Sequence, residues 1–225
     1  MKQELTQTIA QFKNLLIMTK RDNIDKVIFN LEDIGFFQAP ASTKFHGSYD
    51  GGLVEHSLNV YTQARYLFEV VKRVRPDVAS TIKEDNLIIA SLLHDICKSK
   101  LYYKIKKWRK DANNKWEEYE TYEKSYKDLP IGHGEKSVVM LLNWGFKLTE
   151  DEILAIRWHM GGFDINEYQD SKLSFNAASE KPLTAIIVAA DWLASRISEA
   201  DPVQQKENSD GKAEEKSKGK RNTKV

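Results

Sequence analysis

The fold of this chain is decided by one stretch, Leu87-Ile88-Ile89-Ala90-Ser91-Leu92-Leu93-His94-Asp95-Ile96-Cys97-Lys98. The residues before His94 are apolar nearly all round a helix, so we expect this helix to lie at the centre of a helical domain. His94 and Asp95 close the helix and should project inward from its end. A single buried histidine is more often a satisfied core residue than a ligand, but imidazole beside carboxylate suits a divalent first-row metal.

Outside this stretch, three further histidines and one aspartate stand in apolar, helical surroundings. They are His56 in GGLVEHSL, His133 in IGHGEKS, His159 in IRWHMGG and Asp191 in IIVAAD. Burying Asp191 costs on the order of several kcal/mol unless a metal, or a basic residue such as Arg196, compensates its charge. His133 precedes a helix, whose N-terminus keeps the ring neutral, whereas His159 ends a helix and could instead cap it. Six such groups on five segments predict a metal site.

Helical periodicity dominates the rest of the chain, which predicts an all-α domain. We expect two N-terminal helices within residues 1–39 that pack on a core domain of residues 40–200. Within the core domain, further helices are expected at 53–75, ending before Pro76, and at 134–144, 150–160 and 182–197. From residue 201 to 225 the chain is rich in Lys, Glu and Ser and lacks aromatic residues, which predicts a disordered tail.

Residues 101–128 break the helical pattern and predict a β-hairpin insertion. Apolar and polar residues alternate from Leu101, and Asp111-Ala112-Asn113-Asn114 is typical of a turn. Lysines and aromatic residues mix on the first strand, a combination that can track a phosphate backbone and stack bases. The second strand is acidic, however, so cross-strand pairing should neutralise the lysines. We therefore favour a structural or lid hairpin beside the cleft over a nucleic-acid surface.

Composition limits the class of protein and its partners. The 225 residues carry 34 Lys+Arg against 33 Asp+Glu, so a net charge of +1 gives no global attraction for nucleic acid or an anionic membrane. No apolar run approaches about 18 residues, and the N-terminus is too polar for a secretory signal. A single cysteine fits a reducing compartment. We expect a cytoplasmic protein without membrane contact; its oligomeric state is not predicted.

The order His56, His94-Asp95, Asp191 resembles the HD superfamily of metal-dependent phosphohydrolases, all-helical domains named for the adjacent His-Asp pair. The resemblance spans roughly residues 40–200 and implies an HD helical bundle, here with a small β-hairpin insertion. Residues 51–57 also resemble the first motif of HD domains in certain bacterial 3′–5′ exoribonucleases. The chain departs from the His-Asp-x-Gly-Lys variant of the motif at Cys97, although Lys98 is retained.

The resemblance also implies a ligand set and a catalytic centre. Two histidines, at positions 133 and 159, match the subset of HD domains that hold two metals. One divalent ion (Mn, Fe, Co, Ni or Mg) would be held by His56, His94, Asp95 and Asp191. A second ion would be completed by His133 and His159, with Asp95 bridging. A metal-activated hydroxide between the two ions would then attack the phosphorus atom, while both the attacking and the leaving oxygen are stabilised.

Three residues are candidates for contact with the substrate phosphate. Lys98 would supply a point charge to a phosphate oxygen, and is equally well read as a surface cation near a helix C-terminus. Arg196, one turn beyond Asp191, could do the same or pair with Glu199. His46, in the loop before the first motif, could touch substrate or protonate the leaving group, although a plain loop histidine is favoured. Cys97 should be inert core.

The leading prediction is a hydrolase that cleaves a phosphomonoester or phosphodiester bond, in a nucleotide or a related small molecule rather than a nucleic-acid polymer. Two alternatives stay open. A di-iron oxygenase is one, because inositol oxygenase and a phosphonate-cleaving relative resemble this ligand set, and imidazole and carboxylate suit several metals. A non-catalytic nucleotide sensor is the other, although the intact ligands and Lys98 argue against it.

Overall fold

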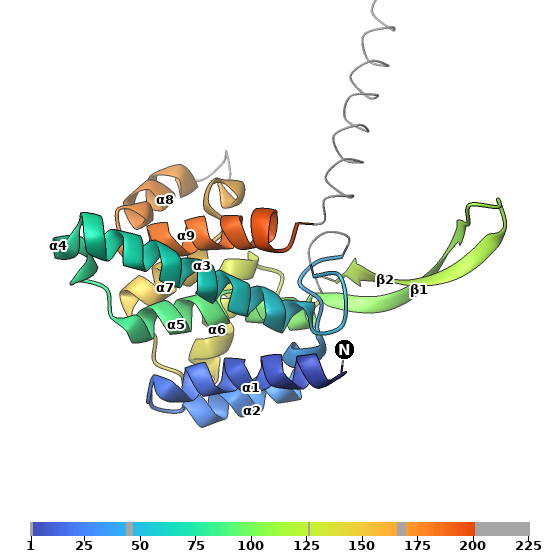
Figure 1. The fold of residues 1–225 in the computed structure, drawn as a ribbon, viewed down its shortest axis with the longest axis horizontal. Coiled ribbons are helices and arrows are strands. Elements are labelled where there is room, and N and C mark those ends of the chain that lie inside the picture. The colour runs from blue at the N-terminus through green and yellow to red at the C-terminus, as the bar shows by residue number, and fades with distance from the viewer. Residues whose placement is uncertain (1, 44–46, 126, 166–169, 201–225) are drawn as a thin grey trace, which may run out of the picture.

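A computed structural model describes residues 2–43, 47–125, 127–165 and 170–200. Within these residues the protein is all-α with one two-stranded antiparallel hairpin, which confirms the predicted fold class (Figure 1). The helices are α1 (Lys2–Met18), α2 (Ile24–Asp33), α3 (Gly52–Val74), α4 (Pro76–Ala79), α5 (Glu84–Leu93), α6 (His133–Asn143), α7 (Glu150–Trp158), α8 (Ser171–Ser179) and α9 (Pro182–Leu193). The strands are β1 (Tyr102–Lys110) and β2 (Trp116–Lys124).

Helix α5 is the centre of the bundle, as its sequence predicts. Every residue from Asn86 to Leu93 is buried, and the helix packs against α1, α3, α7 and α9. Each fully buried Leu or Ile contributes about 1.5–3 kcal/mol, so this one helix supplies a large part of the hydrophobic stabilisation. Because α5 is enclosed, the residues at its C-terminal end are carried into the interior of the domain.

The N-terminal helices lie along one side of the bundle, where α1 packs on α3 and α5 (Figure 1). A polar contact adds to this packing. The Arg21 guanidinium, in the turn after α1, lies 2.6 Å from the carboxylate of Glu152, which is fully buried on α7. Glu152 also forms a capping box with Thr149 at the start of α7. The N-terminal segment is therefore joined to the core by both apolar and ionic contacts.

Two helix boundaries differ from the sequence predictions in an informative way. Helix α9 ends at Leu193 rather than at 197, and the chain widens into a π-helical turn at Ala194–Ser198. Helix α8 was not predicted, because it buries only Ser171 and Ala178 and so has no apolar stripe. Pro76 ends α3 as expected and opens the short helix α4. The predicted tail, 201–225, lies outside the described residues.

The hairpin projects away from the helical body (Figure 1). Its strands pair in register from Tyr102↔Lys124 to Lys110↔Trp116, and the Asp111 side chain accepts hydrogen bonds from the backbone N–H groups of Asn113 and Lys115 in the turn. The predicted charge pairing is confirmed. The pairs are Lys104–Glu120, Lys106–Glu118, Lys107–Glu123 and Arg109–Glu117. The hairpin arm therefore neutralises most of its own lysines and arginine.

Candidate metal centre

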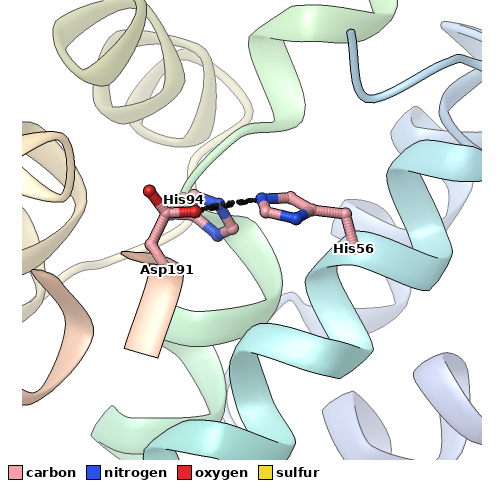
Figure 2. Close-up of side chains that lie close together, drawn as sticks. All are labelled: His56, His94 and Asp191. Carbon is pink, nitrogen blue, oxygen red and sulfur yellow. Dashed lines mark hydrogen bonds and ion pairs between the residues drawn. The ribbon is translucent and has the colours of Figure 1, made fainter. Parts of the chain in front are cut away.

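Three helices bring His56, His94 and Asp191 to one point (Figure 2). His56 comes from α3, His94 follows the last residue of α5, and Asp191 comes from α9. The Nε2 atom of His56 lies 3.1 Å from Oδ1 of Asp191 and 3.3 Å from Nε2 of His94. All three side chains are buried or nearly so. Two ring nitrogens and a carboxylate oxygen thus face one another in the interior.

A second group shares His94 and is centred on Asp95. The Nε2 atom of His94 lies 3.2 Å from Oδ2 of Asp95, and that of His159 lies 3.4 Å from Oδ1. The Nε2 atom of His133 lies 3.9 Å from the same Oδ1, and the His133 and His159 rings are 4.9 Å apart. The structure therefore brings together all six residues that the sequence predicts as metal ligands.

Gly134 makes the approach of His133 possible. A Cβ atom at this position would lie 2.3 Å from the backbone oxygen of Arg157 in α7, well inside van der Waals contact. Only glycine therefore lets the first turn of α6 press against the last turn of α7. His133 is the first residue of α6 and His159 follows the last residue of α7, so this backbone contact sets their rings side by side.

Helix ends orient two of the histidines. The Nδ1–H group of His94 donates to the backbone oxygen of Ser91 at 2.8 Å, and that of His159 donates to Ile156 at 2.7 Å. These are carbonyl groups of a last helical turn, which have no partner within the helix. The hydrogen bonds fix the proton on Nδ1 and leave Nε2 to face the cluster, as a neutral metal ligand requires. His159 is thus both a helix cap and a member of the cluster.

His56 is oriented by Glu199, a residue that the sequence analysis did not assign to the site. The Nδ1–H group of His56 donates to the Glu199 carboxylate, with distances of 3.0 and 3.1 Å to its two oxygens. Asn59, one turn after His56 on α3, donates to the same carboxylate at 3.0 Å. Glu199 follows the π-helical turn directly, so no periodic pattern places it near α3.

The ionisable residues of the cluster have pKa values that are shifted in different directions. Burial works against the charge of Asp95, but Lys98, His94 and His159 hold the pKa of this carboxyl well below its usual range. Burial also opposes a charged His56, yet Asp191 and Glu199 raise its pKa to about 10. Burial, reinforced by His159, lowers the pKa of His133 to about 3. Without metal, His56 is therefore protonated between two carboxylates, whereas His133 is neutral.

The donor set fits a divalent cation. Several buried polar atoms of the cluster accept or donate no well-directed hydrogen bond within the described residues; they are both oxygens of Asp95 and the Nε2 atoms of His133 and His159. Such orphaned atoms are costly unless an ion occupies the space between them. Imidazole nitrogens and carboxylate oxygens in this mixture are typical ligands of first-row divalent metals. These residues can therefore hold a divalent metal.

The predicted substrate residues have different surroundings. Lys98 is buried rather than on the surface, and its ammonium lies 2.6 Å from Oδ2 of Asp95. Arg196 is exposed and stands over the Trp192 ring at 5.0 Å. His46 lies outside the described residues. Cys97 is buried, its thiol donates to the backbone oxygen of His133, and burial raises its pKa to about 12, as expected of an inert thiol.

Comparison with known proteins assigns the family. Residues 53–196 match the HD domain family model, and the chain belongs to this family. A 61-residue stretch is 38% identical to dihydroneopterin 2′,3′-cyclic phosphate phosphodiesterase of Methanocaldococcus jannaschii, covering 27% of this chain and 23% of the relative. The chain thus matches less than a quarter of that protein's length. No solved structure matches the chain significantly. Among the described residues, no helix is long and apolar enough to span a bilayer.

Proposed function

We propose that the protein is a metal-dependent phosphohydrolase that cleaves a phosphomonoester or phosphodiester bond of a small molecule of the nucleotide type. The observation that carries this proposal is the convergence of buried imidazoles on the Asp95 carboxylate, with the Lys98 ammonium beside it. Family membership and the partial match to a phosphodiesterase support phosphate-ester hydrolysis in general. The name of the archaeal relative refers to a cyclic phosphodiester of a small heterocycle, which supports a small substrate here.

The six clustered residues would form two adjacent cation sites. His56, His94, Asp95 and Asp191 would hold one cation, and His133 and His159 would hold a second with Asp95 shared between them. Such cations lower the pKa of water and stabilise charge on phosphoryl oxygens. Asp95 lies between the His94 and His159 rings, with its oxygens 3.2 and 3.4 Å from their Nε2 atoms, so both halves of the proposed site depend on it.

Lys98 is the residue proposed to contact the phosphate. Asp95 counteracts the cost of burial and raises the pKa of Lys98 above its ordinary value, so the ammonium is charged at neutral pH. A charged donor beside the ligand cluster can bind a non-bridging phosphoryl oxygen as a point charge. Arg196 and His46 are proposed as further phosphate contacts. The single, buried Cys97 supports a cytoplasmic location.

The proposal is tested with protein purified without chelators and supplied with Mn²⁺. We expect hydrolysis of 4-nitrophenyl phosphate or bis(4-nitrophenyl) phosphate, abolished in Asp95→Ala. Asp77→Ala is the matched control, because this exposed aspartate of α4 pairs only with Arg75 within the described residues. Absence of hydrolysis with every divalent metal would overturn the proposal. Oxygen consumption that depends on mixed-valence iron would show an oxygenase, and tight nucleotide binding without turnover would show a sensor.

A further inference from the structure

A pocket of about 290 Å³ lies between the foot of the hairpin and the N-terminal end of α6. It reaches the metal centre at two residues, Lys98 and His133. The remaining lining residues are Cys97, Leu101, Tyr102, Lys124, Ser125, Asp128, Leu129, Ile131, Gly132, Lys136 and Met160. The pocket therefore opens directly beside the groups proposed to bind the phosphate.

The walls of this pocket come from both the insertion and the helical body. From the insertion, residues 101–128, come Leu101, Tyr102, Lys124, Ser125 and Asp128, and the other lining residues belong to the segment after α5, to the approach to α6, to α6 itself and to Met160. The hairpin is closed at its foot by a hydrogen bond from the backbone N–H of Ser125 to the oxygen of Leu101, at 2.8 Å. The pocket therefore lies at the junction between the hairpin and the helical bundle.

The charge of the pocket is positive, and one of its cations is uncompensated. Lys98 pairs with Asp95, and Lys136 lies 3.2 Å from the carboxylate of Asp128. Lys124, at the last position of β2, has no acidic partner within the described part of the chain. The basic residues along β1 that do have one are Lys104, Lys106, Lys107 and Arg109. An unpaired ammonium beside a cavity attracts an anionic group.

The pocket also presents apolar surface. Leu129 and Ile131 line it and keep 40% and 41% of their surface exposed. Leu129 has a φ of +41°, in the left-handed region that a branched side chain rarely adopts. Backbone strain of this kind persists where the surroundings over-determine it, typically at ligand sites. The exposed apolar side chains of Leu129 and Ile131 line the same pocket as the Lys124 ammonium. Such a pocket suits a ligand with an organic ring and a second negative charge.

We propose that this pocket binds the organic part of the substrate, and that Lys124 contacts an anionic group other than the phosphate that is cleaved. The substrate class is a phosphate ester of about nucleoside size that carries a second acidic group, such as a nucleotide with two phosphates. A volume of about 290 Å³ accommodates one such unit and not a polymer chain. The inference rests on the proposed function, because it assumes that the phosphate to be cleaved sits at the metal centre.

The charge part of the proposal is tested with adenosine 5′-monophosphate and adenosine 3′,5′-bisphosphate as probes. Calorimetry on the metal-loaded protein gives dissociation constants without requiring turnover. In Lys124→Ala, the dissociation constant of the bisphosphate should rise about tenfold and that of the monophosphate no more than about twofold. The matched control is Lys110→Ala, because Lys110 lies at the other end of the same hairpin and also lacks an acidic partner among the described residues. Equal effects of the two variants on the bisphosphate would overturn the assignment of Lys124.

The shape part is tested by filling the pocket. In Ile131→Trp, both adenosine nucleotides should bind at least tenfold more weakly, whereas inorganic phosphate should bind as in the wild type. Ile17→Trp, at an exposed position of α1, is the control for a surface tryptophan. Unchanged nucleotide binding in Ile131→Trp would overturn the pocket. The protein could also hydrolyse no ester and still bind nucleotides in a way that Lys124→Ala and Ile131→Trp both weaken. That result would support the pocket and overturn the proposed function instead.

Discussion

The Nδ1 atom of His56 lies 3.0 Å from Oε1 of Glu199, so a buried histidine that faces the metal centre is held from behind by a carboxylate. Asn59 fixes that carboxylate from the side. In metal sites, such an acceptor sets the tautomer and orientation of the ring and raises its basicity as a ligand. Glu199 is therefore a positioning residue. It lies three residues beyond the end of the HD family match, in the segment that follows α9.

Replacing Glu199 should weaken metal binding without removing a ligand. In Glu199→Ala, we expect the dissociation constant for Mn²⁺ to rise by roughly 10–100-fold, because His56 loses both its orientation and the partner that increases its basicity. Glu199→Gln should restore part of the affinity, since its amide oxygen still accepts the Nδ1–H hydrogen bond. Calorimetric titration of chelator-treated protein with Mn²⁺ measures the effect.

Ser198→Ala is the control for the Glu199 variants. Ser198 belongs to the same turn and contacts α3 through Gln63, but it does not touch the cluster. Its loss should leave the Mn²⁺ affinity as in the wild type. If Ser198→Ala and Glu199→Ala weaken binding equally, the turn acts by general packing and the positioning role of Glu199 is wrong.

The sequence predicts the six clustered residues because each breaks a local expectation. Asp191 lies within an apolar helix, and His94 and Asp95 follow the apolar run of another helix. The sequence therefore predicts that these polar groups are buried. Glu199 could not be found this way, because it lies in a polar segment after a π-helical turn, where helical periodicity no longer predicts which face a residue occupies. The structure supplies what the pattern lacks, namely the long-range contact with α3.

The hairpin shows the same division between local and long-range information. Its strands and turn follow from alternation and from Asp111, because these signals act over a few residues. Its charge pairing also follows once the register is known. The pocket at the foot of the hairpin cannot be predicted from the sequence in this way, because it depends on how the segment around Leu129 returns to α6. Only the three-dimensional arrangement separates Lys124 from the paired lysines of the arm.

Loss of the central ligands should remove the metal. We expect Asp95→Ala and His94→Ala each to lose bound metal when purified without chelators, because each residue contributes to the shared part of the cluster. Metal content measured by plasma mass spectrometry checks this, with Asp77→Ala as an exposed control. Full metal content in both variants would refute the assignment of the site.

Metal binding should release protons at neutral pH. His56 has a pKa raised from 6.5 to about 10, so its Nε2 carries a proton in the metal-free fold that a cation must displace. The apparent Mn²⁺ affinity should therefore rise with pH from neutral pH up to about pH 10. His133, with its pKa near 3, contributes no proton. The same shift stabilises the metal-free fold below about pH 6.5, and this contribution is lost as the pH rises through about 10.

Calorimetry in two buffers of different ionisation enthalpy measures that release. At pH 7.5 we expect about one proton, that of His56, to be released per protein molecule in the wild type. Glu199→Ala should release fewer, because the hydrogen bond that favours the charged ring is gone. A binding enthalpy that does not depend on the buffer would show that His56 is neutral before the metal binds.

The ion pair of Arg21 with Glu152 should matter for stability because one partner has no access to water. Glu152 is fully buried and Arg21 only 21% exposed, so Arg21→Ala leaves a carboxylate whose remaining partner within the described residues is the backbone N–H of Thr149. We expect the free energy of unfolding to fall by about 2 kcal/mol in guanidinium denaturation. Arg75→Ala provides the comparison, since its pair with Asp77 has the same 2.6 Å distance but both side chains are more than 60% exposed. That variant should unfold like the wild type, because solvent screens an exposed pair. Equal losses in the two variants would mean that burial of Glu152 does not set the strength of the contact between the N-terminal segment and α7.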